Sequence, residues 1–278
     1  MKEKYSVEHK TLDTIIGYIN SGEIAIPEIQ RPFVWKASQV RDLIDSLYRG
    51  YPAGYLIISQ SPDMKLKNGK KSEGEKIMID GQQRVTALMT AIAGQQILDK
   101  DFKKKRIIIS FNPLADEDSE EEIFKVQDNA IRKDSKWIAD IADVFSAKFS
   151  IWSFVPEYLL NNPDVTPDKV GKAIERLQKI RNRQLGVIVL EKDLTIDEVT
   201  EIFVRINSKG AELNQADFVM SKIAANTSYN GNMLRKAIDY FSHLAIDPKW
   251  YDEMTKDTEF MASEFAPKLE WLKNDQGD

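Results

Sequence analysis

The sequence contains no cysteine, only two histidines and no long apolar run. The absence of cysteine excludes disulfides, thiolate nucleophiles and cysteine-ligated zinc or iron–sulfur sites. The two histidines, His9 and His243, lie far apart in the chain, so a metal site or nuclease motif that needs several histidines is not expected. Any metal is therefore expected to be a hard cation such as Mg²⁺, held by carboxylates, water and substrate phosphates.

No apolar stretch approaches the roughly 20 residues that a membrane-spanning helix needs. The N-terminal residues MKEKYSVEHK also lack the apolar segment of a signal peptide. We therefore expect a cytoplasmic protein that does not contact membranes. With 278 residues, of which 42% are hydrophobic and 30% charged, the chain is long enough to bury one large core or two smaller ones.

The net charge of −5 argues against a chain that coats nucleic acid through bulk positive charge. Basic residues nevertheless concentrate in two segments, Lys103–Arg106 and Lys169–Arg183. The second segment is predicted to be a helix, because it follows the start signal Thr166-Pro167-Asp168. Its basic face is either solvated surface or a contact for DNA, and the sequence leaves both interpretations open.

Helical patterns alternate with short apolar segments along the first part of the chain. Apolar spacing predicts helices at about 12–20, 38–49 and 82–93, and buried strands at 54–59, 77–79, 106–111 and 185–190. The last of these strands can return to the same sheet. We predict an α+β fold with a domain at 1–212, a helical insertion at about 123–183, and the start of a helical C-terminal region at 213–278.

The stretch IMIDGQQRVTAL, residues 77–88, indicates a binding site. A buried strand ends in Asp80, Gly81 lets the backbone turn tightly, and an amphipathic helix starts at once. The unpaired N–H groups and dipole of that helix favour an anion, and Arg84 adds a forked donor for phosphate. Gln82 and Gln83 can orient a water or read a base or sugar. The alternative is an ordinary cap, with Asp80 as N-cap and exposed polar residues after it.

A second polar segment, IPEIQRPFVW at residues 26–35, places Gln30 and Arg31 on an extended backbone that two prolines stiffen. Arg31 can reach a phosphate, and Gln30 can reach a polar edge of a ligand. Trp35 is either a core anchor or a stacking surface for a base. We predict that Gln30 and Arg31 converge with the turn at residues 80–84 on one pocket.

Three segments follow one another as they do in a known family. IPEIQRPFVW with a helix and YPAGYLII, then IMIDGQQRVTALMTAI, and then FVRINSKGAELNQADF resemble the N-terminal domain of GmrSD-type modification-dependent restriction proteins. The resemblance covers residues 12 to about 222 and is weak in the middle. DGQQR is the hallmark of that family, whose fold is ParB/sulfiredoxin-like, a mixed sheet with helices.

The resemblance implies a nucleotide-dependent module that hydrolyses GTP or a related nucleoside triphosphate and licenses cleavage of modified or foreign DNA. We expect Mg²⁺ in the reaction, with Asp80 as its ligand. The expected catalytic residues are Asp80, Gln82, Gln83 and Arg84. The expected nucleotide-binding residues are Gln30, Arg31, Gly81, Arg205, Asn207 and Asp217.

Family members commonly continue into an HNH-type nuclease domain, for which this chain has neither the length nor the histidines. We therefore expect this chain alone not to cut DNA, with the nuclease in a further part of a longer protein or in a separate subunit. Two other interpretations stay open. One is a nucleotide- or DNA-binding module without turnover, which acts as a specificity or partner-binding subunit. The other is an interaction subunit with a vestigial site.

Overall fold

The computed structural model describes residues 3–25, 33–59, 76–98, 104–115, 121–195, 198–199, 201–202, 205, 223 and 229–273. The chain divides into two compact units. The first comprises residues 1–26, 31–62 and 73–195, and the second comprises residues 27–30, 63–72 and 196–278.

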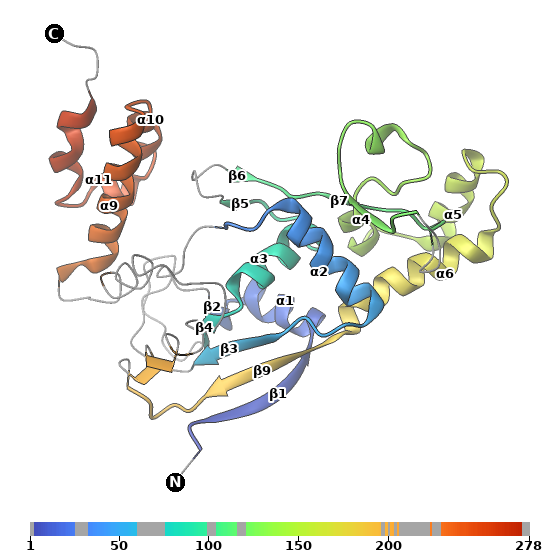
Figure 1. Cartoon of the computed structure of the whole chain (residues 1–278), viewed down its shortest axis with the longest axis horizontal. Helices are drawn as coiled ribbons and strands as arrows, with labels where there is room; N and C mark the ends of the chain where they lie inside the picture. Colours follow the sequence, from blue (N-terminus) through green and yellow to red (C-terminus); the bar gives the residue numbers. More distant parts are fainter. Residues whose placement is uncertain are drawn as a thin grey trace. The chain divides into compact units, whose positions relative to one another are not determined.

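A five-stranded mixed sheet with the order β1-β9-β3-β4-β2 organises the first unit (Figure 1). Its strands are β1 (Tyr5–Thr11), β2 (Ile24–Ala25), β3 (Tyr55–Ser59), β4 (Lys76–Asp80) and β9 (Gln184–Leu190). β9 pairs antiparallel with β1 and parallel with β3, so the predicted return of this late strand to the sheet is confirmed. β4 pairs antiparallel with β3 and parallel with β2.

Three helices pack their apolar faces against one side of this sheet. They are α1 (Leu12–Ser21), α2 (Ala37–Arg49) and α3 (Gln82–Ala91). Leu56 and Ile58 of β3 and Met78 of β4 belong to the same buried core as these helices. The predicted α+β class is confirmed, but α2 begins before Ser38. Its N-cap is Lys36, because the Gln39 side chain accepts a hydrogen bond from the Lys36 N–H at 2.9 Å.

The segment after α3 forms two short ribbons. β5 (Ile97–Leu98) pairs with β6 (Lys104–Lys105), and β7 (Ile109–Phe111) pairs with β8 (Phe124–Val126). Residues 124–126 were expected in a helical pattern, but they form a strand. The ring of Phe124 packs against Phe111 and Tyr48, with centroid separations of 5.2 and 5.3 Å, and this aromatic cluster favours strand pairing over a helix.

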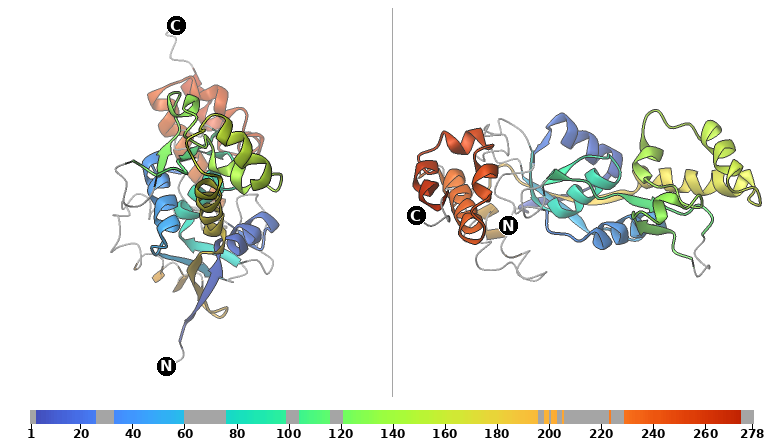
Figure 2. Two further views of the ribbon diagram at one scale, coloured as in Figure 1. Left: turned by 90° about the vertical axis from the view of Figure 1, so that its right-hand side faces the viewer. Right: turned by 90° about the horizontal axis from the view of Figure 1, so that it is seen from above.

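The rest of the insertion is helical and forms a lobe of the first unit, coloured green to yellow (Figures 1 and 2). It contains η1 (Ile131–Lys133), α4 (Ile141–Phe145), α5 (Ile151–Leu160), α6 (Pro167–Gln178) and η2 (Lys179–Asn182). Val170, Ile174 and Leu177 of α6 are fully buried. α6 therefore presents its opposite, charged face to solvent.

In the second unit, the helices with described bounds are α9 (Gly231–Ile246), α10 (Trp250–Met254), α11 (Thr258–Met261) and η4 (Ala266–Lys273). They have a separate core that includes Leu244, Met254 and Phe260. His243 stacks on Trp250 with ring centroids 4.3 Å apart, which is a packing contact. Within the described ranges of both units, no helix is long and apolar enough to cross a membrane.

Candidate functional site

The DGQQR segment forms the corner between β4 and α3. β4 ends at Asp80 and α3 begins at Gln82, with Gly81 as the N-cap at φ +98°. An L side chain rarely adopts this conformation, and a Cβ on Gly81 would lie 2.3 Å from Cδ2 of Leu56. The corner therefore requires glycine for its backbone and for its packing. The ordinary-cap alternative is wrong in one respect, because the N-cap is Gly81 and not Asp80.

Gln82 occupies the first position of α3 and is only 6% exposed. Its side-chain carbonyl Oε1 is buried and has no hydrogen-bond partner in the part of the chain that the structure describes. Leaving a buried acceptor unpaired costs about 1 to 3 kcal/mol. Such a group in a helix N-terminal turn indicates a site for a donor that the described part of the chain does not supply.

Gln83, its neighbour, is engaged differently. Its Oε1 accepts a hydrogen bond from the backbone N–H of Val34 at 3.0 Å. This bond connects the first turn of α3 to the PFVW part of the proline-containing segment, 49 residues earlier. Gln30 and Arg31 lie outside the described residues, so their convergence with the corner stays a prediction.

Arg84 contacts the start of β3. Its Nη1 donates a hydrogen bond to the carbonyl oxygen of Tyr55, and its guanidinium carbon lies 3.3 Å from the position of a Cβ on Gly54. Its Nη2 is 3.9 Å from a carboxylate oxygen of Asp80, and the two side chains are 25% and 27% exposed. Arg84 thus has a structural role, while its charge and that of Asp80 remain partly open to solvent.

The third predicted segment is FVRINSKGAELNQADF, of which the structure describes only Arg205. Arg205 forms an ion pair with Glu201, and both side chains are largely exposed. Asn207 and Asp217 lie outside the described residues. Among the described side chains, no group of three His, Asp or Glu could hold a metal ion. Mg²⁺ can be bound by a single carboxylate together with substrate phosphates. Asp80 could therefore be its protein ligand when a nucleotide is bound.

The basic segment Lys169–Arg183 serves the fold through its arginines. The Arg176 guanidinium lies over the ring of Tyr48 at 4.3 Å, and Arg181 donates to the carbonyl oxygen of Phe145 at 2.6 Å. Arg183 donates to the carbonyl oxygens of Leu47 and Tyr48 at 3.0 and 3.2 Å, which caps the C-terminus of α2. The side chains of this segment that stay exposed include Lys169, Lys172 and Lys179.

A pocket of about 560 Å³ opens beside the corner, and the sequence did not predict it. Three segments that are distant in sequence line it, so no local pattern could reveal it. The lining residues are Phe33, Val34, Trp35, Lys36, Ala37, Lys105, Arg106, Ile107, Ile108, Val126 and Gln127. Val34 belongs both to this pocket and, through Gln83, to the contacts of α3.

The model of one family, described as the GmrSD restriction endonuclease N-terminal domain, matches residues 12–224. The chain belongs to this family. The match covers the DGQQR corner, the helical insertion and every strand of the five-stranded sheet except β1. GmrSD membership makes the chain a component of a restriction or defence system.

A relative of the chain is "Uncharacterized protein MJ0686" of Methanocaldococcus jannaschii. The two are 22% identical over an alignment of 252 positions, which covers 78% of this chain and 42% of the relative. The chain thus matches less than half the length of this relative. The relative is longer than this GmrSD-family chain, and its name states no activity.

Proposed function

We propose that this chain is the nucleotide-hydrolysing regulatory module of a DNA restriction system, acting on GTP or a related nucleoside triphosphate. The observation that carries the proposal is the buried, unpaired Oε1 of Gln82 in the first turn of α3. The N-terminus of a helix favours an anion such as a phosphate, through its N–H groups and its dipole. The corner therefore combines an anion-binding end with an acceptor for which the described residues provide no donor.

In this proposal the phosphates of the nucleotide lie at the N-terminus of α3. Gly81 permits the positive-φ turn after which the first N–H groups of α3 can point at the phosphates. Arg84 is held by the carbonyl oxygen of Tyr55 and offers its remaining N–H groups to phosphate oxygens. A cation in the first turn of a helix gains nothing from the helix dipole, and an anionic ligand would offset that cost.

The two glutamines have different roles in this proposal. Gln83 positions Val34 through its side-chain oxygen. Gln82 orients the attacking water, because an unpaired carbonyl oxygen accepts a hydrogen bond from a water but cannot bond an ionised phosphate oxygen. A positioned water approaches the terminal phosphorus in line with the leaving oxygen.

Asp80 is the carboxylate at the corner that would hold Mg²⁺ or help to orient the water. Its long contact with Arg84, at 3.9 Å, leaves carboxylate oxygens for another partner. When bound, Mg²⁺ would neutralise charge on the phosphates. The role of the protein is to place the nucleotide and the water, because positioning and electrostatics dominate phosphoryl transfer.

The test is release of inorganic phosphate from each of the four nucleoside triphosphates with Mg²⁺, by wild type and Gln82→Met. Methionine keeps the shape of the side chain and removes the acceptor. We expect a rate at least about 100-fold lower and a free energy of unfolding that is unchanged or about 1 kcal/mol higher. Gln184→Met is the matched control, because Gln184 is exposed on β9.

The outcomes separate the proposal from its rival. A full rate in Gln82→Met would remove Gln82 from the mechanism. Tight nucleotide binding by wild type without phosphate release would favour the binding module without turnover. In either case we expect the purified chain not to cut modified DNA. Mg²⁺-dependent cleavage that is lost on a single carboxylate substitution would contradict the assignment of the nuclease to another domain or subunit.

A further inference from the structure

The pocket beside the corner has apolar walls and a charged mouth. Two of its lining residues, Phe33 and Ile107, are buried, at 4% and 6% exposure. Trp35, Ile108 and Val126 are half-buried and line its walls. A volume of about 560 Å³ is within the usual range for sites that hold a small organic ligand.

Hydrogen bonds within the chain fix the walls of the pocket. The Ile107 N–H donates to Oγ1 of Thr90 in α3 at 3.0 Å. Gln127 donates its backbone N–H to the Ile108 carbonyl at 3.0 Å and its side-chain amide to the Ala139 carbonyl at 2.8 Å. The pocket is therefore part of the folded framework, and a ligand would find it already formed.

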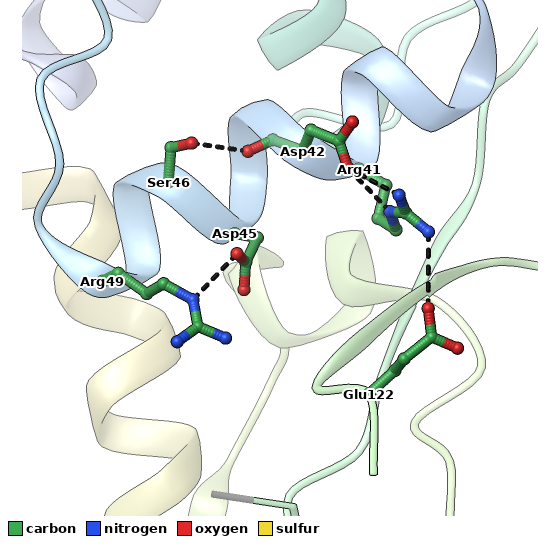
Figure 3. A network of polar contacts seen from close by, with 6 residues as sticks. All are labelled: Arg41, Asp42, Asp45, Ser46, Arg49 and Glu122. Atoms are coloured by element: carbon green, nitrogen blue, oxygen red, sulfur yellow. Dashed lines mark hydrogen bonds and ion pairs between the residues drawn. The ribbon is translucent and has the colours of Figure 1, made fainter. Parts of the chain in front are cut away.

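An ion network ties α2, which begins in the pocket, to the ribbon that carries Val126 (Figure 3). Arg41 of α2 pairs with Asp42 at 2.7 Å and with Glu122, just before β8, at 3.5 Å. Arg49 and Asp45 form a further pair on the same helix at 2.8 Å. The pair with Glu122 connects α2 to the segment before β8, outside the pocket lining.

The mouth of the pocket favours an anionic group. Lys36 is exposed and is the N-cap of α2, where the helix dipole disfavours a cation. Arg106 also lines the pocket, but the Asp140 carboxylate neutralises it through contacts of 2.6 and 2.8 Å. Lys36 therefore contributes positive charge at the mouth of the pocket. It lies at the N-terminus of α2, and a helix N-terminus itself attracts anions.

Two hydrogen bonds join the lining of the pocket to α3. Val34 lines the pocket and bonds to Gln83 in the first turn of α3. At the other end, Thr90 bonds to the pocket residue Ile107. Gln83 and Thr90 are about 10 Å apart along the helix axis, at 1.5 Å per residue, so the pocket runs beside α3 from its N-terminal turn.

We propose that this pocket holds the base and ribose of the nucleotide whose phosphates lie at the corner. This inference rests on the proposed function and names a second part of the same site. The apolar walls, with Trp35 among them, suit the planar base, and Lys36 suits the charge of the phosphate chain. The base subsite thus comes from the ribbons and the start of α2, outside the DGQQR segment.

The experiment is calorimetric titration of wild type and variants with two kinds of probe. One kind is the set of four non-hydrolysable imido triphosphates, and the other is inorganic tripolyphosphate. Val126→Trp fills the pocket, so it should weaken binding of the tightest nucleotide by about tenfold or more and change the tripolyphosphate affinity by less than about twofold. Lys36→Glu should weaken the nucleotide by about tenfold. Lys104→Glu is its matched control, since Lys104 is exposed and outside the pocket lining.

Four outcomes would overturn the inference. Wild-type nucleotide affinity in a folded Val126→Trp would place the base elsewhere. Equal losses of nucleotide and tripolyphosphate in that variant would make the pocket a phosphate site. If Val126→Trp does not fold, equal effects of Lys36→Glu and Lys104→Glu would exclude the pocket. Absence of nucleotide binding by wild type would overturn the proposed function as well as the base subsite. The first three outcomes would overturn only the base subsite.

Discussion

The DGQQR corner and the basic segment Lys169–Arg183 look alike in sequence, since both place polar and charged residues on a helix. The structure uses them in opposite ways. Arg183 donates to two backbone carbonyls at the C-terminus of α2, so its guanidinium completes the fold. Gln82 is buried with an unpaired acceptor. Two polar segments that look alike in sequence can therefore differ in whether the fold satisfies their side chains.

The partial charge of the helix dipole explains part of the difference between the two segments. Arg183 lies at the C-terminus of α2, where a cation is stabilised by the dipole and by the free carbonyls. Arg84 lies at the N-terminus of α3, where a cation is mildly disfavoured. The helix dipole therefore favours the placement of Arg183, whereas Arg84 is held against the dipole by the Tyr55 carbonyl and Asp80.

The largest effect is expected at the corner. Gly81→Ala should destabilise the first unit by about 3 to 5 kcal/mol, because a Cβ there overlaps Leu56 and the backbone has a positive φ. Denaturant unfolding would measure this. Gly171→Ala is the control, since nothing lies within 4 Å of a Cβ on this residue of α6. The free energy of unfolding of Gly171→Ala should rise by up to about 1 kcal/mol. Equal changes in the free energy of unfolding of the two variants would contradict the corner geometry.

Arg183→Met tests the structural use of the basic segment. Loss of the two hydrogen bonds to the C-terminus of α2 should lower the free energy of unfolding by about 2 to 3 kcal/mol. Nucleotide affinity should not change, since Arg183 does not contact the corner in this proposal. Lys179→Met, at an exposed position, should change stability by less than about 0.5 kcal/mol. A stable Arg183→Met variant with altered nucleotide affinity would assign Arg183 to binding and not to the fold.

Arg84→Lys tests whether Arg84, unlike Arg183, acts in nucleotide binding. Lysine keeps the charge but not the planar fork, so nucleotide binding or turnover should fall about tenfold to a hundredfold. Stability should fall by only about 1 kcal/mol, from the weakened bond to the Tyr55 carbonyl. Titration and thermal melting of both proteins would measure these effects. Unchanged affinity with a large loss of stability would make Arg84 a structural residue like Arg183.

The smallest effect on stability is expected for the exposed lysines. Replacing Lys169, Lys172 and Lys179 together by alanine should change the free energy of unfolding by less than about 0.5 kcal/mol. If the segment binds DNA, the dependence of log affinity on log salt should flatten by about 0.9 for each DNA phosphate that the variant no longer neutralises. Binding measured at several salt concentrations would show this. An unchanged slope would assign these lysines to solvated surface.

Periodicity predicted the elements that have one well-buried face. α1, α2 and α3 and the strands β3, β4 and β9 were predicted because their apolar spacing matches their burial. β1 was missed because YSVEHKT is a mostly exposed edge strand, paired only with β9. β8 was missed because its pairing depends on a contact between Phe124 and Phe111, which no local pattern contains.

The chemistry of the site was predicted less completely than its location. Sequence placed Asp80 to Arg84 at a strand-to-helix corner, which is confirmed. It could not separate Gln82 from Gln83, because adjacent helix residues point in different directions and their partners are remote. It also could not predict the partners of Arg183, which lie about 135 residues earlier in the chain.

The position of β9 between β1 and β3 has a consequence for the order of folding. β1 is the first strand of the chain and β9 the last of the sheet, with the register Tyr5 to Leu190. On the ribosome, neither β1 nor the free edge of β3 can pair with β9 until residues 184–190 have emerged. Such distant pairing slows folding and leaves strand edges exposed to other chains. Translation of the whole insertion therefore precedes closure of the sheet, and a fragment that stops before Gln184 should aggregate.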